Sequence, residues 1–140
     1  MANWLTRLLL GAGGDKEEKR RGPTPVDDYQ TTSTGLKYCD LEVGSGVAPE
    51  LGQKVKVHYI GWLTNGREFD SSVKRNKPFT FELGRRKVIK GWDEGVVAMK
   101  VGGVRQLRVP AALAYGPMGR PPRIPKNATL VFEIEVLSAG

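Results

Sequence analysis

The fold is expected to be organised around Val88-Ile89-Lys90-Gly91-Trp92-Asp93-Glu94-Gly95-Val96-Val97-Ala98-Met99-Lys100, a short segment with the apolar spacing of a helix. Four apolar residues recur at steps of four, four and three, which places one stripe on an α-helix: Val88, Trp92, Val96 and Met99. Two glycines in the segment cost helix stability, and one use for them is close approach by a sheet or a ligand. The pattern predicts a short helix whose tryptophan packs against a surrounding sheet, although Trp92 alone is compatible with an ordinary core position.

Length, cysteine content and charge limit the classes of protein to which this sequence can belong. The 140 residues suffice for one domain with a core and a tail, and no apolar run approaches the roughly 18 to 20 residues that span a bilayer. Cys39 is the single cysteine and cannot form an internal disulfide, so the cytosol is the expected compartment. Residues 1–35 contain five basic and five acidic side chains, so the net charge of +7 falls within residues 36–140. This excess favours acidic or phosphate-bearing partners at low salt but is also typical of an ordinary surface, and we do not expect nucleic-acid binding.

The first 35 residues are expected to form a flexible tail and linker. Residues 4–10 include a short amphipathic segment, whose apolar residues share one helical face: Trp4, Leu5, Leu8 and Leu9. A helix this short is marginal alone in water, because isolated helices need about 12 to 15 residues. Three interpretations remain open: a passive tail, a docking peptide for a protein complex, and an anchor at a membrane surface.

Residues 36–140 are predicted to form one α+β domain. Alternating apolar and polar residues indicate strands over 36–43, 54–63, 79–83, 104–110 and 130–137, with Lys54, Lys56 and His58 on the polar face of the second strand. Asn65-Gly66 predicts a type I′ hairpin turn that returns through Glu68 and Phe69. Prolines and glycines between residues 111 and 129 predict a long loop without regular structure. The expected fold is a five- to six-stranded antiparallel sheet curled around one short helix.

The sequence contains no conventional catalytic constellation. Its one histidine, His58, is expected on a polar strand face, and a single cysteine leaves no clustered metal-binding set. The predicted inward positions and the long loop instead gather many rings: Tyr59, Phe69, Phe79, Phe81, Trp92, Tyr115 and Phe132. These rings either form plain core or line an apolar cleft with Asp70 nearby, and any catalysis there must act through shape and desolvation.

Several spaced motifs resemble those of the FKBP-type peptidyl-prolyl cis-trans isomerases, the immunophilins that bind macrolide drugs. The resemblance runs collinearly from about residue 36 to residue 138 and rests on Val57-His58-Tyr59, Gly66, Phe69-Asp70-Ser71-Ser72, Asn76-Lys77-Pro78-Phe79, Val88-Ile89-Lys90-Gly91-Trp92-Asp93-Glu94-Gly95, Ala114-Tyr115-Gly116, Ile124-Pro125 and Ala128-Thr129-Leu130-Val131-Phe132. It does not include residues 1–34. Relatives often have histidine or small or apolar residues where this chain has Arg120 and Arg123, and a charged rim would favour acidic residues near the proline.

The resemblance implies a prolyl isomerase that acts on Xaa-Pro bonds in protein substrates, assists folding as a monomer and needs no cofactor. It implies catalytic roles for Tyr59, Asp70, Tyr115 and Phe132, with Asp70 bonded to the Tyr59 hydroxyl. It also implies a substrate-binding set with Trp92 as the floor and the Ile89 amide as a donor: Phe69, Phe79, Val88, Ile89, Trp92 and Ile124. The alternative is an FKBP-like binding subunit or assembly factor, docked to a larger complex by its tail, in which catalysis is incidental.

Overall fold

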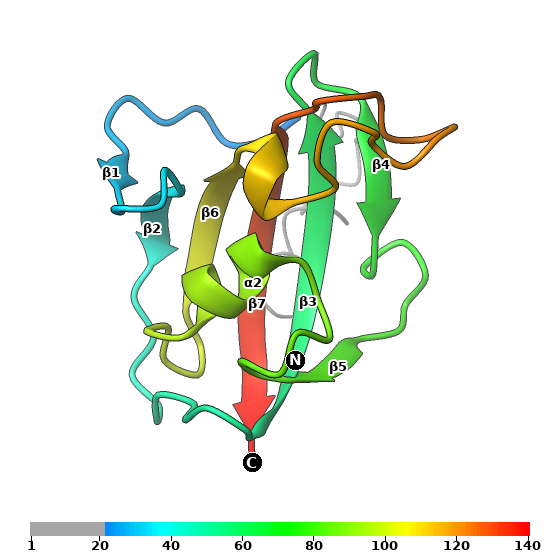
Figure 1. The fold of residues 1–140 in the computed structure, drawn as a ribbon. Helices are drawn as coiled ribbons and strands as arrows, with labels where there is room; N and C mark the ends of the chain where they lie inside the picture. Colours follow the sequence, from blue (N-terminus) through cyan, green and yellow to red (C-terminus); the bar gives the residue numbers. More distant parts are fainter. Residues whose placement is uncertain (1–21) are drawn as a thin grey trace.

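The structure is a computed structural model that describes residues 22–140 (Figure 1). Its elements, in chain order, are β1 Gln30–Thr31, β2 Lys37–Glu42, β3 Lys54–Leu63, β4 Glu68–Ser71, β5 Phe79–Glu82, α2 Lys90–Val96, β6 Val104–Val109, the 3-10 helix η1 Ala111–Leu113 and β7 Leu130–Ala139. No helix among these elements is both long and apolar enough to cross a membrane. The amphipathic segment predicted at residues 4–10 lies outside the described residues.

The strands form one antiparallel sheet that carries α2 against one face, as the α+β prediction requires (Figure 1). The strand order is β1-β2-β6-β7-β3-β4, and β5 pairs with β3 beside this path. β3 and β7 have ten residues each and pair along their length, which makes them the central pair of the sheet. The predicted strands are all present, and the short β1 is an addition that the sequence pattern did not indicate.

Two glycines let α2 lie close to the sheet. A Cβ atom at Gly91 would come within 2.5 Å of Val109 Cγ1, and one at Gly95 within 2.7 Å of Leu107 Cδ1. Both neighbours belong to β6, so any larger residue would push the helix away from the core. The predicted stripe is only partly helical, because Val88 precedes α2 and Met99 follows it, but both pack on the core that Trp92 and Val96 enter.

The hairpin between β3 and β4 differs from the predicted type I′ turn. Gly66 has a φ of +90°, whereas Asn65 is not among the described residues with positive φ. The Leu63 amide donates to the Arg67 carbonyl at 2.8 Å, and the Gly66 amide donates to the Leu63 carbonyl at 2.9 Å. This pattern is a three-residue loop with a left-handed glycine at its end, which needs positive φ at one position instead of two.

His58 is buried, which corrects its predicted place on a polar surface. It is 7% exposed, and its Nδ1 lies 2.8 Å from the Ser72 hydroxyl. The same face of β3 continues into Ile60 and Trp62, which form a second apolar cluster with Val131 of β7. The alternation of β3 therefore marks a solvent-facing side only near its start, at Lys54 and Lys56.

The segment before residue 36 contacts the sheet, so the predicted linker ends earlier than expected. The Thr24 amide donates to Glu133 Oε2 at 2.7 Å, and Gln106 Nε2 donates to the Thr24 carbonyl at 2.8 Å. Further along, β1 pairs with β2. Among the described residues, contacts with the sheet thus extend to Thr24, 12 residues before the predicted boundary at residue 36.

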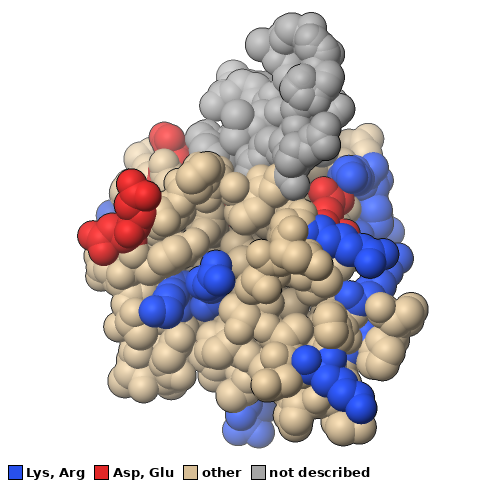
Figure 2. Space-filling model, turned by 90° about the horizontal axis from the view of Figure 1, so that it is seen from above, with Lys and Arg blue, Asp and Glu red and all other residues tan. Residues whose placement is uncertain are grey.

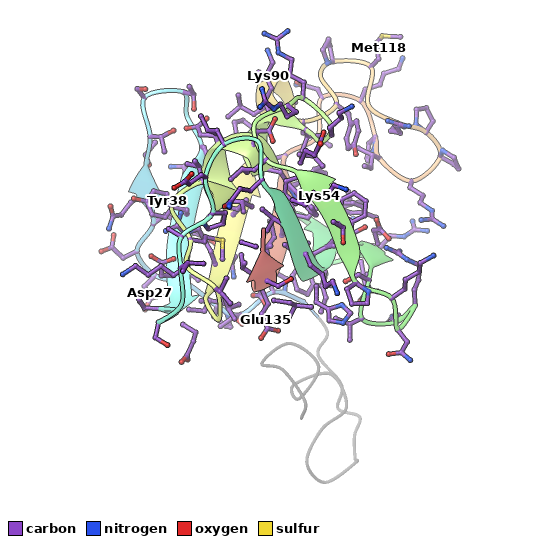
Figure 3. All side chains as sticks on the ribbon, turned by 90° about the horizontal axis from the view of Figure 1, so that it is seen from below. Asp27, Tyr38, Lys54, Lys90, Met118 and Glu135 are labelled. Carbon is purple, nitrogen blue, oxygen red and sulfur yellow. The ribbon has the colours of Figure 1, made fainter. Side chains whose placement is uncertain are left out.

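The long loop between β6 and β7 has more local structure than its composition predicts. It opens with η1, and a pair of hydrogen bonds of 2.8 and 3.0 Å joins the backbones of Arg120 and Ile124. Gly119 has a φ of +67°, and a Cβ there would lie 2.2 Å from the Pro125 carbonyl oxygen, so only glycine fits. Met118, which is 70% exposed, lies where this loop extends beyond the sheet (Figure 3).

Candidate active site

A cavity of about 180 Å³ opens between α2, the strand ends and the long loop. We call it the proline cavity, and its lining residues are Tyr59, Phe69, Asp70, Phe79, Lys87, Val88, Ile89, Trp92, Tyr115 and Phe132. Nine of these ten are residues that the sequence pointed to, and Lys87 is the additional one. Side chains do not fill the hollow, so the rings do more than complete a core.

Trp92 lies at the centre of the aromatic cluster. Its ring centroid is 4.9 Å from that of Tyr59 and 5.3 Å from that of Phe132, both in edge-to-face contact. Phe81 and Phe79 approach it at 5.6 and 6.0 Å. The indole nitrogen Nε1 is buried without a hydrogen-bond partner among the described residues, although a buried tryptophan usually finds one. The apolar floor of the proline cavity is thus fixed by packing from several sides.

Gly61 makes room for the wall of the cavity. A Cβ atom at this position of β3 would lie 2.7 Å from Phe69 Cζ and 2.9 Å from Phe132 Cε1. Those two rings meet edge to face with centroids 5.6 Å apart. The missing side chain therefore lets both rings settle against the strand, a role that no sequence pattern indicated.

Tyr59, Asp70 and Arg75 form a polar rim at one side of the rings. The Tyr59 hydroxyl donates to Asp70 Oδ2 at 2.5 Å, and Arg75 pairs with Asp70 Oδ1 and donates to the Tyr59 oxygen at 3.1 Å. Burial, helped by the Asp70 carboxylate, raises the pKa of Tyr59 from 10.0 to about 12. Tyr59 therefore keeps its proton at physiological pH and remains a donor to Asp70.

Ser72 fixes the backbone beneath this rim. Its hydroxyl accepts from the Tyr59 amide at 2.8 Å, while its own amide donates to the Tyr59 carbonyl at 3.0 Å. Ser72 has no exposed surface. The side chain of Tyr59 is thereby aimed into the cavity by bonds that a sequence motif cannot reveal.

Two unused polar groups border the rings. The Ile89 amide and the Tyr115 hydroxyl have no hydrogen-bond partner among the residues that the structure describes. Just after Ile89, the Asp93 carboxylate accepts from the amides of Gly84 and Arg86 at 2.8 and 3.0 Å. Asp93 thus fixes the loop that leads to Ile89, and the amide remains available to a ligand.

Three other residues that the sequence singled out do not line the cavity themselves. Ile124 is 5% exposed and packs in the main core instead of lining the cavity. The Arg120 guanidinium lies 5.3 Å from the ring centre of Tyr115. Arg123 donates to the Phe69 carbonyl at 3.2 Å, outside the proline cavity.

Comparison with known proteins agrees with this geometry. A family model described as FKBP-type peptidyl-prolyl cis-trans isomerase matches residues 46–137. The chain is 57% identical over 116 residues to "FK506-binding protein 4" of Dictyostelium discoideum, which covers 83% of this chain but only 31% of that longer protein. It is 50% identical over 103 residues to the "FK506-binding protein" of Neisseria meningitidis serogroup B, covering 74% of this chain and 94% of that one.

A solved structure has the same fold. The crystal structure of AtFKBP13 superposes with a TM-score of 0.77 at 41% sequence identity, covering 81% of this chain and 100% of that chain. The chain belongs to the family of FKBP-type peptidyl-prolyl cis-trans isomerases.

Proposed function

We propose that the domain catalyses cis-trans rotation about Xaa-Pro bonds in protein substrates. The observation that carries this proposal is the open, ring-lined proline cavity above Trp92, bordered by a hydrogen-bonded carboxylate. An apolar ring such as pyrrolidine suits these walls, and the two unused polar groups at its border suit the carbonyls of an extended chain.

The chemistry requires no covalent step. Rotation about a prolyl amide breaks its resonance, which opposes rotation of a peptide bond by roughly 18 to 20 kcal/mol. The planar amide is more charge-separated than the twisted one, so a dry aromatic cavity stabilises the twisted form relative to the planar form. Tighter binding of the transition state than of the ground state then accelerates the exchange.

Each part of the site has a proposed role in this rotation. Trp92 supports the proline ring from below, and Phe132 and Phe69 close the wall. The Ile89 amide and the Tyr115 hydroxyl donate to substrate carbonyls. Asp70, oriented by Tyr59 and Arg75, faces the twisting amide.

The test is a prolyl-isomerase assay on a neutral proline tetrapeptide. We expect Trp92→Leu and Phe132→Tyr each to lower kcat/KM about tenfold or more, which corresponds to about 1.4 kcal/mol of lost transition-state stabilisation. The first removes the floor, and the second adds a polar hydroxyl to an apolar wall. Near-ultraviolet circular dichroism checks that both variants remain folded.

Tyr38→Phe is the matched control, because the Tyr38 hydroxyl bonds to Gln30 at the β1–β2 edge of the sheet. It should retain the wild-type rate. Unchanged kcat/KM in both cavity variants would overturn the proposed site.

Further expectations are proposals, each with its own support. Macrolide binding in the proline cavity is suggested by the relatives named for FK506. A cytosolic location rests on the single cysteine, and a folding function rests on the proposed reaction. We also propose that the catalytic domain includes Thr24, because this residue bonds to Glu133 and Gln106 of the sheet.

A further inference from the structure

A second hollow of about 390 Å³ lies directly beside the proline cavity. We call it the basic cavity, and its lining residues are Arg67, Glu68, Phe69, Asp70, Ser71, Lys74, Arg75 and Arg123. Phe69 and Asp70 line both hollows. Because the two hollows share these residues, we expect a side chain close in sequence to a bound proline to reach the second hollow.

The basic cavity has uncompensated positive charge. Lys74 pairs with Glu68 at 3.0 Å, and Arg75 pairs with Asp70. The remaining two cations, Arg67 and Arg123, form no ion pair with a carboxylate among residues 22–140. Seen from above, Lys and Arg side chains gather on the side of the molecule where β4 lies (Figure 2).

These two guanidinium groups come from separate loops that the fold holds in place. Arg67 follows the β3–β4 turn, and its backbone carbonyl accepts a hydrogen bond of 2.8 Å from the Leu63 amide. Arg123 precedes the buried Ile124, and its Nη1 donates to the Phe69 carbonyl at 3.2 Å. An arginine has five N–H donors, so the other donors of Arg123 stay available to an anion.

We propose that the basic cavity binds an anionic side chain of the substrate, a carboxylate or a phosphate, close to the isomerised proline. This inference rests on the proposed function and names the substrate class of the same site. The anion would accept hydrogen bonds from Arg67 and Arg123, which match carboxylate and phosphate geometry. The neutral, ring-lined cavity would bind the proline, and its charged neighbour would select among proline sites.

The test compares peptides that differ only in one side chain near the proline. Each peptide carries Glu, phosphoserine or Gln at one of the two residues before the proline or the two after it. At one of these positions we expect the wild-type kcat/KM for Glu to exceed that for Gln by about three- to tenfold, the range that one or two exposed ion pairs provide. Phosphoserine should exceed Glu, because it carries more negative charge.

The double variant Arg67→Gln/Arg123→Gln should reduce the Glu-to-Gln ratio to near one. Lys37→Gln/Lys100→Gln is the control: it removes the same total charge outside the basic cavity and should retain the ratio. Raising the salt from about 50 mM to about 200 mM should also lower the ratio in the wild type, because exposed charges are screened.

The outcomes separate this inference from the proposed reaction. No activity on the Gln peptide would overturn the isomerase proposal, and isothermal titration of the Glu and Gln peptides would still measure the anion preference without turnover. Normal activity with a wild-type ratio near one at every position would overturn the anion site alone. An equal fall of the Glu-to-Gln ratio in the control variant would also overturn the anion site, because the effect would then come from net charge.

Discussion

The proline cavity and the basic cavity share Phe69 and Asp70 but are built in opposite ways. The walls of the first come largely from core side chains: Trp92 and Phe132 are 4% exposed, and Tyr59 is 7% exposed. The second is lined by β4 and by four exposed cationic side chains from three loops: Arg67, Lys74, Arg75 and Arg123. The same core that stabilises the domain therefore shapes the reaction site, whereas the charges beside it can change at little cost to the fold.

This difference predicts which substitutions affect the stability of the domain and which affect only its preference among substrate peptides. A change beneath the proline cavity should lower both the free energy of unfolding and the activity on neutral peptides. A change in the basic cavity should alter the preference between charged and neutral peptides. Three tests address the first half of this comparison, in descending order of expected effect.

Gly61→Ala should have the largest effect, because its new Cβ would meet Phe69 and Phe132 at less than 3.0 Å. We expect the overpacking to cost about 1 to 3 kcal/mol of unfolding free energy. The displaced rings should also lower kcat/KM on a neutral peptide about tenfold. Urea denaturation and the peptide assay measure the two effects.

Gly22→Ala is the control for this variant, since the nearest atoms to its Cβ lie 4.0 Å away. It should leave both quantities unchanged. If Gly61→Ala also left both unchanged, the wall of the proline cavity would be more adaptable than the packing indicates, and the contrast with the basic cavity would weaken.

Asp93→Ala should have an intermediate effect. It removes the acceptor for the amides of Gly84 and Arg86, and we expect a loss of about 1 to 2 kcal/mol in unfolding free energy. The loop before Ile89 would loosen, so kcat/KM should fall about threefold, mainly through KM, as binding contacts are lost.

Glu94→Ala removes a carboxylate that accepts from the exposed hydroxyl of Thr34, and it is the control that should change stability by less than about 0.5 kcal/mol. The Glu-to-Gln preference of the basic cavity should survive in both variants. Loss of that preference in Asp93→Ala would show that the two cavities are coupled through the loop.

Acid should have the smallest effect. Burial lowers the pKa of His58 from its ordinary value of 6.5, so the folded state favours the neutral imidazole. The unfolded chain then binds a proton more readily, and the stability contributed by His58 is present above about pH 6.5 and lost as the pH falls towards the folded-state pKa.

Urea midpoints between about pH 7 and about pH 5 measure this dependence. The carboxylates contribute equally to the pH dependence of wild type and His58→Gln, so subtracting the His58→Gln curve of urea midpoint against pH leaves the contribution of His58. A wild-type curve no steeper than that of the variant would contradict the burial argument, and an NMR titration of His58 would give its pKa directly.

Much of the fold was predictable because local periodicity reports which face of each element is buried. The alternation in β7 predicted that strand to within two residues, and the spacing around Trp92 predicted a helix that proves shorter than the stripe. Periodicity failed on the second face of β3. His58 follows a polar pattern, yet it is buried, with its ring bonded to Ser72 and a second apolar cluster on the same strand face. Periodicity also failed at Thr24, where a segment of loop composition finds partners on distant strands.

The residues that form the proline cavity could be inferred from ring content and family motifs. The residues that hold them in position could not. Gly61, Ser72 and Asp93 act on cavity residues through contacts that no spacing encodes. Ile124 was expected in the cavity, but it packs in the core and is not among the lining residues.

The alternation of buried faces, the helical stripe and the family motifs could all be read along the chain, because each depends on residues that are close together in sequence. The meeting of two hollows at Phe69 and Asp70 could be seen only in three dimensions, as could the position of Arg67 and Arg123 beside one of them. Those two arginines are 56 residues apart in the sequence. Their proximity arises from sheet pairing and loop closure, which bring distant segments together and which local patterns do not specify.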